Sequence, residues 1–248
     1  MKYTVECVFL IHCSKWEFGL DKSHMDVQSL YYQKYRNSFR LGTYLALLKT
    51  MSIAHLVGQL YGDSQLNMQT YVRLDRTRMF IKTLIQSGID SEQSKQIIEH
   101  LNRVHANLPA TNDDFLYVLS TFILEPIRFN QRFSQNHLTD DEVACLVAFW
   151  REVGDAMLIR HLPATAQEWR VFQRQYEANY QHYTKEGNDL ASRSLQEVVK
   201  LSLPFGIRCI ARQLILGALT SNTLKALGLA KPWLPFRLSS AVIRLSGD

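Results

Sequence analysis

The chain has few of the residues that build tight turns, disulfides or membrane spans. Only 11 glycines and 6 prolines occur among its 248 residues, which argues against a turn-rich β-sandwich. The four cysteines are widely spaced and form no C-x-x-C pair. We therefore expect reduced thiols in a cytosolic setting, with neither a disulfide framework nor a zinc site. No run of about 18 apolar residues is present, so the sequence predicts no ordinary membrane span.

Motifs of several large enzyme classes are also absent. The sequence contains no G-x-x-x-x-G-K-[ST], no G-x-G-x-x-G, no G-x-S-x-G and no H-E-x-x-H. Phosphate-binding enzymes, dinucleotide oxidoreductases and zinc proteases are therefore disfavoured. We expect no nucleic-acid partner.

The N-terminus does not have the pattern of a secretory signal. Polar or charged side chains interrupt the place where an apolar signal core would lie: Glu6, His12, Lys15 and Glu17. We treat residues 1–27 as an N-terminal extension whose status is open, with Met25 as a candidate start. Residues 28–248 then form the domain.

The positive charge of the chain is confined to its C-terminal quarter. Residues 190–248 carry eight Lys or Arg and two Asp or Glu, whereas residues 1–189 carry 20 basic and 21 acidic side chains. A basic, apolar segment of this kind favours an anionic membrane surface or an acidic partner. A solvated basic face is the simpler interpretation, and both stay open.

The rest of the sequence predicts one all-α globular domain. Hydrophobic residues make up 46% and charged residues 21%, which is typical of a chain with a substantial core. No sustained apolar/polar alternation occurs, so we expect no sheet. Three capping boxes open helices, at Thr111/Asp114, Thr139/Glu142 and Thr165/Glu168. The expected helices are 28–61, 66–87, 90–108, 113–133, 140–158, 166–184, 189–202 and 205–219, with a loop at 231–237.

Polar residues occupy apolar faces of two of these helices. Arg73 and Thr77 extend the face that carries Phe80 and Leu84, and a buried guanidinium needs a counter-charge. The partner is an acid, an anionic cofactor or, in the simpler interpretation, an ordinary salt bridge. His105 falls within the stripe of the helix 91–108, which comprises Ile97, Leu101, Val104 and Leu108. His100 lies at its margin. A histidine there is a metal or haem ligand or a satisfied core residue.

A third polar group lies in the apolar helix that starts at the first capping box. Glu125 stands beside Pro126, which we expect to kink the helix. Arg128 follows at a spacing that allows an internal ion pair. The alternative is that Glu125 faces Arg73.

These residues resemble a known family. The segment Arg73–Thr77 resembles the R-x-D-x-T helix of the mycophenolic-acid-pathway (MpaB-type) oxygenases, whose superfamily includes the rubber oxygenases, or latex clearing proteins. Asn102–His105 resembles the histidine helix of the same family. Further segments resemble the MpaB branch in the same order, over about residues 40–185: Asn112–Leu119, Leu124–Phe129, Leu138–Glu142, Phe149–Gly154 and Leu162–Thr165.

The resemblance implies a helical domain that encloses one b-type haem. It implies His105 as the proximal iron ligand, with Arg73 and Thr77 close to the haem. The implied reaction is the O₂-dependent oxidative cleavage of a carbon–carbon double bond in an isoprenoid-like chain. The haem would supply the chemistry, and the protein would set the axial ligand, the polarity of the pocket and access to it.

The chain departs from the rubber-cleaving branch at one point. That branch uses a glutamate base upstream of the arginine, whereas residues 51–72 contain no Glu and only one acid, Asp63. His55 and Gln59 are the other polar candidates there. Three interpretations stay open: the mechanism differs, another acid such as Glu125 substitutes, or this member does not cleave.

The sequence thus favours a cytoplasmic, haem b-dependent oxygenase that acts on a lipophilic small molecule, with peripheral membrane contact through residues 190–248. One alternative is a non-catalytic helical protein that binds haem or a lipid. Another is a helical interaction module that binds an acidic partner through the basic tail. The candidate site residues are Arg73, Thr77 and Glu125 for catalysis, Arg73 and Thr77 also for contact with the haem, and His105 for the iron.

Overall fold

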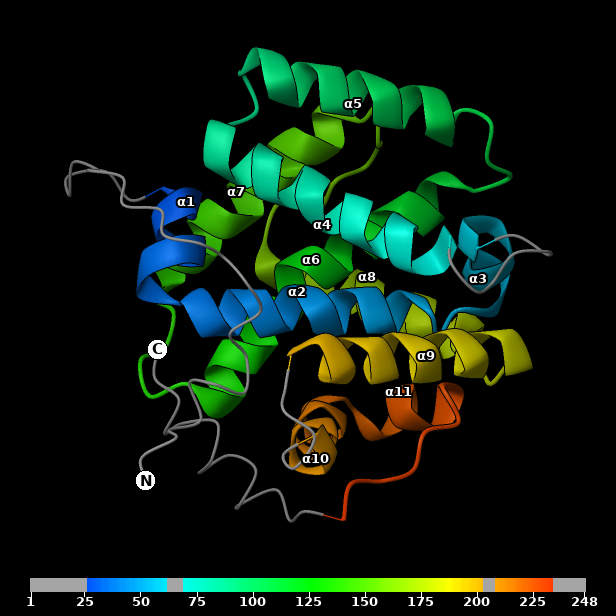
Figure 1. The fold of residues 1–248 in the computed structure, drawn as a ribbon. Coiled ribbons are helices and arrows are strands. Elements are labelled where there is room, and N and C mark those ends of the chain that lie inside the picture. The colour runs from blue at the N-terminus through cyan, green and yellow to red at the C-terminus, as the bar shows by residue number, and fades with distance from the viewer. Residues whose placement is uncertain (1–25, 62–68, 203–207, 234–248) are drawn as a thin grey trace.

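The computed structural model describes residues 26–61, 69–202 and 208–233 (Figure 1), without the side chains of residues 59–61, 69–75 and 200–202. Every regular element in these ranges is helical, and the only β-contact among them is an isolated bridge between Ile53 and Gln181. The predicted all-α fold is confirmed. The elements are α1 (Val27–Ser29), η2 (Leu30–Lys34), α2 (Arg36–Thr50), α3 (Ala54–Tyr61), α4 (Gln69–Ser87), α5 (Glu92–His105), α6 (Asn112–Phe133), α7 (Asp140–Ala156), α8 (Ala166–Tyr180), α9 (Lys185–Ser202), α10 (Arg208–Ala218) and α11 (Ser221–Ala226).

The segment expected to be one helix over 28–61 is divided into four elements, so that prediction was wrong. Tyr35 leaves the helical region with φ −130° and ψ 41°, which separates the π-turn of η2 from α2. At the other end of α2, Thr50 Oγ1 donates to the Leu47 carbonyl at 2.8 Å and Ser52 Oγ donates to the Lys49 carbonyl at 2.6 Å. These local side-chain bonds satisfy carbonyls that the end of a helix leaves open.

The capping signals place the later helices accurately. Thr111 and Thr139 each form a complete capping box, and α6 and α7 begin directly after them. Thr165 caps α8 in the same way, but the Glu168 carboxylate accepts from the Ala164 N–H, one residue earlier than predicted. Local hydrogen bonding decides these boundaries, which explains why sequence alone finds them.

Helix α6 runs through the centre of the molecule and is crossed closely by α2. It continues from Asn112 to Phe133 across Pro126, so the proline does not end it. At the crossing, a Cβ added to Gly42 would lie 2.3 Å from the Cα of Pro126. Only glycine at position 42 lets the two backbones approach this closely.

Helix α2 separates two groups of helices in Figure 1, with α4 and α5 on one side and α9, α10 and α11 on the other. One buried apolar cluster joins η2, α2 and α4–α8, and a second joins α2 and α6 to α9–α11. Helix α11, capped by Thr220, was not predicted. Within the described ranges, no helix combines the length and apolarity needed to cross a bilayer. Residues 1–25 and most of the predicted loop 231–237 lie outside the described residues.

Candidate functional site

The histidine predicted as the iron ligand is the last residue of α5 and faces the interior. The His105 ring is half-buried, with its centroid 4.8 Å from that of Phe115 on α6. Burial lowers the pKa of His105, which favours the neutral imidazole. No described side chain hydrogen-bonds this ring. A neutral ring is the form of histidine that binds a metal, so the surroundings of His105 are compatible with the ligand role predicted for it, which stays a prediction.

The buried face of α5 is rotated from the predicted one. Val104 is 43% exposed and does not belong to the buried stripe, and His100 is exposed. Ser94 and Ile98 are buried, and Leu101 and His105 continue their line at helical spacing. His105 therefore lies on the centre line of the face that packs inward. The helix starts at Glu92 rather than at the expected residue 90, because the Ser91 side chain caps it.

Helix α4, which carries the Arg73–Thr77 segment, packs against α5. The α4–α5 hairpin is antiparallel, and its register is given by the edge-on contact of Phe80 with His100 at 6.0 Å. Thr77 is half-buried, as expected for its face. The Arg73 side chain lies outside the described residues, so its role stays a prediction.

Glu125 lies inside the protein and does not face solvent. Its side chain is fully buried, and Oε1 lies 2.8 Å from Nζ of Lys49. Arg128 pairs with the other oxygen, so the internal pair expected from the spacing is confirmed. Lys49 also lies 2.8 Å from Glu177 Oε1.

The cluster around Glu125 is balanced and desolvated. Its two carboxylates, Glu125 and Glu177, meet two cations. Burial lowers the pKa of Lys49 to about 8 and that of Arg128 to about 10. Each oxygen of the Glu125 carboxylate is paired with a cation, so the structure shows this side chain as a member of an ion cluster. A catalytic role for it stays a prediction.

A polar cluster that the sequence did not reveal lies at the start of α6. Asp114 Oδ1 is 2.7 Å from Nε2 of His55 on α3 and accepts a hydrogen bond from the Tyr176 hydroxyl on α8. His55 and Tyr176 are 3.2 Å apart. Burial alone would raise the pKa of Asp114, but hydrogen bonds from His55, Tyr176 and Thr111 lower it below its usual range. Burial and the Asp114 carboxylate raise the pKa of Tyr176.

His55, one of the polar candidates upstream of Arg73, belongs to this cluster. Its partners are 59 and 121 residues away along the chain, and no local pattern connects them. Asp114 was assigned only to the capping box. The structure gives it both tasks, because Oδ2 accepts from the Thr111 N–H while Oδ1 holds His55. Gln59 belongs to the residues whose side chains are not described.

The two histidines and the α4 turn therefore gather at one end of the molecule. His55 and His105 contact α6 at consecutive residues, Asp114 and Phe115. In Figure 1, α3, the start of α4, the end of α5 and the start of α6 meet there. This end of the molecule thus holds one imidazole packed on an aromatic ring, a second imidazole held by a carboxylate, and the helix that carries Thr77.

Comparisons with known proteins identify the family of the chain. The family model described as ER-bound oxygenase mpaB/B'/Rubber oxygenase, catalytic domain, matches residues 36–245. The chain is 24% identical over 202 residues to ER-bound oxygenase mpaB' of Penicillium brevicompactum, covering 75% of this chain and 41% of that protein. It is 25% identical over 170 residues to ER-bound oxygenase mpaB of the same organism, covering 64% and 36%. The chain thus spans about two fifths of the length of these relatives. Because the family model covers most of it, the chain belongs to the mpaB/B' and rubber oxygenase catalytic-domain family.

Proposed function

We propose that the protein is a haem b-dependent oxygenase with His105 as the axial iron ligand. The observation that carries this proposal is the His105 ring, whose pKa is lowered by burial and which packs on Phe115. Membership of an oxygenase family supports the reaction class. When bound, a haem would supply the activation of O₂ and the electron transfer that amino-acid side chains lack.

The residues of the chain then have separate tasks. His105 holds the iron, and Phe115 fixes the plane of the imidazole by packing on it. Thr77 presents a hydroxyl from α4, and Arg73 brings a positive charge to the same turn. His55, oriented by Asp114, presents an imidazole at this end of the molecule that can accept or return a proton.

The substrate class follows from the surroundings and the relatives. We infer a lipophilic, isoprenoid-like small molecule that the protein meets at a membrane surface, with oxidative cleavage of a C=C bond as the reaction. Both relatives are named as ER-bound. In the basic quarter of this chain, Ile210 and Trp233 are 45% and 64% exposed, and Lys231 lies beside Trp233. Exposed tryptophan with basic neighbours is typical of contact with an anionic bilayer.

Oxygen consumption tests the enzymatic half of the proposal. The haem-loaded protein is given a panel of isoprenoid alkenes under O₂, and oxygen uptake and carbonyl products are measured. We expect substrate-dependent uptake that is lost in His105→Ala and kept in His100→Ala, which changes an exposed histidine of the same helix. Uptake that is the same in both variants would remove His105 from the reaction.

A second function is favoured by one observation. Residues 51–72 contain no glutamate that could act as the catalytic base. Glu125, the carboxylate that could replace such a base, is buried between Lys49 and Arg128. A non-catalytic member that only binds haem or a lipid would have this arrangement. It predicts a haem spectrum without substrate-dependent oxygen uptake.

A further inference from the structure

Three tyrosine rings form a continuous stack from the core to the surface beside His55. Tyr117 on α6 and Tyr176 on α8 are nearly parallel, at 14°, with their ring centroids 4.4 Å apart. The Tyr180 ring, one helical turn further along α8, lies 4.8 Å from the Tyr176 ring. Tyr117 and Tyr176 are buried, whereas Tyr180 is 43% exposed. Aromatic contacts alone therefore connect the interior with solvent at this place.

The middle ring of this stack has a proton acceptor. The Tyr176 hydroxyl donates to Asp114 Oδ1, which lies 2.7 Å from Nε2 of His55. The same imidazole nitrogen is 3.2 Å from the hydroxyl, and the imidazole packs edge-on against Tyr180 at 5.2 Å. The His55 side chain is 36% exposed, so a proton held by this pair is close to solvent. A phenol that loses an electron becomes a strong acid, and a hydrogen-bonded base is therefore what its oxidation requires.

Negative charge and ring stacking favour the loss of an electron from Tyr176. Hydrogen bonds from its partners hold the pKa of Asp114 below its usual range, so this carboxylate is ionised beside the phenol at neutral pH. The Tyr117 hydroxyl donates to Glu177 at 3.4 Å, but the Glu177 carboxylate is already paired with Lys49 at 2.8 Å. Tyr176 is therefore the ring of the stacked pair with the better proton acceptor.

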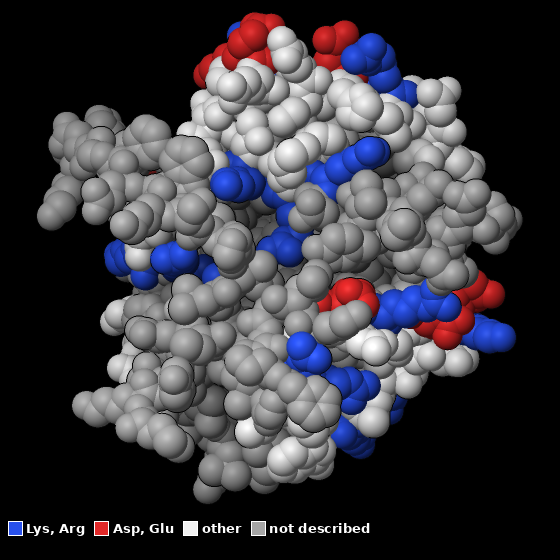
Figure 2. Space-filling model, viewed as in Figure 1, with Lys and Arg blue, Asp and Glu red and all other residues white. Residues whose placement is uncertain are grey.

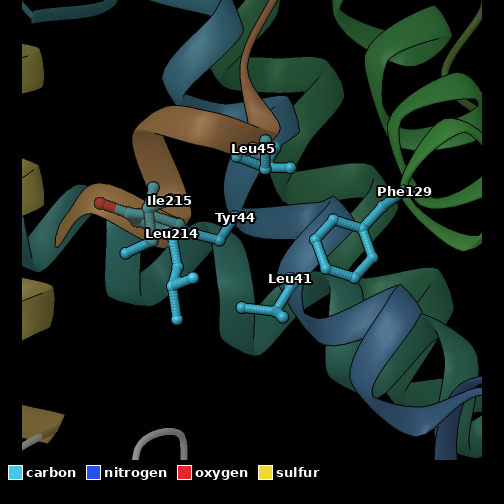
Figure 3. A pocket seen from close by; sticks show the side chains of 7 residues that line it. Leu41, Tyr44, Leu45, Phe129, Leu214 and Ile215 are labelled. Atoms are coloured by element: carbon cyan, nitrogen blue, oxygen red, sulfur yellow. The ribbon is translucent and has the colours of Figure 1, made fainter. Parts of the chain in front are cut away.

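Tyr44 on α2 is a buried tyrosine without these features. Within the described residues, its hydroxyl has no hydrogen-bond partner. Its ring lines an apolar pocket between α2, α6 and α10, and Figure 3 shows the hydroxyl pointing away from Phe129. Figure 2 shows Lys and Arg side chains around a hollow over the junction of α2 and α4, and positive charge disfavours the loss of an electron. Burial alone does not make a tyrosine oxidisable, so Tyr44 is the matched control for Tyr176.

We propose that Tyr176 is a redox-active tyrosine that carries an oxidising equivalent from the haem to the surface. The Tyr176 ring gives one electron to a haem iron left oxidised by its reaction with O₂. Its phenolic O–H bond breaks, and the proton passes to the Asp114 carboxylate. A thiol in solution then returns one electron through Tyr180 and becomes a thiyl radical with the loss of its own proton. The proton on Asp114 goes back to the phenol oxygen, so the tyrosine is restored.

The proposal rests on the haem function above, because the haem is the oxidant that it names. The position of the stack suits this task. Asp114, which accepts from Tyr176, directly precedes Phe115, whose ring lies 4.8 Å from that of His105. An oxidising equivalent that finds no substrate would otherwise remain beside these side chains and damage them.

The first test uses the apoprotein, so that its result does not depend on haem. A photo-excited ruthenium bipyridine complex, with persulfate as electron acceptor, oxidises the protein, and tyrosyl radicals are followed by transient absorption and electron paramagnetic resonance. We expect a long-lived radical in wild type that is lost in Tyr176→Phe and kept in Tyr44→Phe. Asp114→Asn, which weakens the proton acceptor, shortens its lifetime. A long-lived radical that persists in Tyr176→Phe, or that is lost equally in Tyr44→Phe, overturns the proposal.

An exposed ring provides a second variant if Tyr176→Phe does not fold, as checked by circular dichroism. Tyr180→Phe changes the surface end of the stack. With a thiol present, we expect the radical to decay more slowly in Tyr180→Phe than in wild type, because the electron no longer returns through this ring. Equal decay in the two proteins overturns the proposed route to the surface.

The second test uses the haem-loaded protein with hydrogen peroxide as the oxidant. Samples are frozen after mixing, and we expect a tyrosyl signal in wild type that is absent in Tyr176→Phe. Haem uptake, seen by the Soret absorption, without a tyrosyl signal overturns this proposal and leaves the haem function intact. A wild-type protein that takes up no haem overturns the haem function itself, and with it the oxidant assigned to Tyr176.

Discussion

His55 and His105 lie against consecutive residues of α6, because Asp114 holds the first through a 2.7 Å contact and Phe115 packs on the second at 4.8 Å. One turn of one helix thus fixes two imidazoles that come from segments 50 residues apart in number. The first turn of α6 is itself fixed by the Thr111 capping box. Stability at this turn and the geometry of the candidate site are therefore coupled.

The acid sensitivity of this turn is the first prediction. The pKa of Asp114 is lowered in the folded state, so the carboxylate contributes stability above its ordinary value of 3.8 and loses it as pH falls through the lower folded value. Asp114→Asn is therefore destabilising at neutral pH, and the difference from wild type shrinks below about pH 3.8. Urea unfolding across pH measures this. Asp113→Asn, which changes an exposed neighbour in the same turn, is the matched control for the loss of stability at neutral pH.

The crossing of α2 and α6 gives a second prediction. Gly42→Ala places a methyl group 2.3 Å from the Cα of Pro126, so we expect a loss of at least about 1–3 kcal/mol in the free energy of unfolding. Gly58→Ala on α3 meets nothing within 4 Å and should stabilise slightly, because alanine favours the helix. Denaturant midpoints of the two variants decide this. Equal effects would contradict the close crossing.

The buried ion cluster gives a third prediction. Lys49→Met leaves Glu125 and Glu177 without their shared cation, so we expect a loss of about 3–5 kcal/mol. Lys34→Met removes a 53% exposed partner of Glu142 and should cost below about 1 kcal/mol.

A double-mutant cycle of Lys49→Met with Glu125→Gln checks whether the two residues act as one unit. We expect the double variant to lose less than the sum of the single losses. Additive losses would show that Glu125 does not depend on Lys49. That result would reopen the view of Glu125 as a base independent of the cluster.

Sequence reasoning succeeded where the cause is local. The caps Thr111 and Thr139 bond to residues three positions away, so composition and spacing reveal them. The pairing of Glu125 with Arg128 is local in the same sense. Belonging to the oxygenase family was also predicted from short ordered motifs and is shown by the match over residues 36–245.

It failed where partners are distant in the chain. After the local bonds that end α2, Ile53 forms a bridge to Gln181 at the C-terminal end of α8, a partner 128 residues away in number. Lys49 was not suspected, because its partners lie 76 and 124 residues away at Glu125 and Gln173. The face of α5 was misjudged since apolar Val104 proved exposed. Neither helical periodicity nor residue type records which neighbour covers a helix.

The visible absorption spectrum tests the central claim most directly. Wild type, His105→Gly and His100→Gly are expressed with haem supplied, and each spectrum is recorded with and without added imidazole. A Soret band in wild type and His100→Gly that is lost or shifted in His105→Gly, and restored there by imidazole, is the result that a haem ligated by His105 predicts. A folded wild-type protein that takes up no haem, or a His105→Gly spectrum identical to wild type, would contradict it.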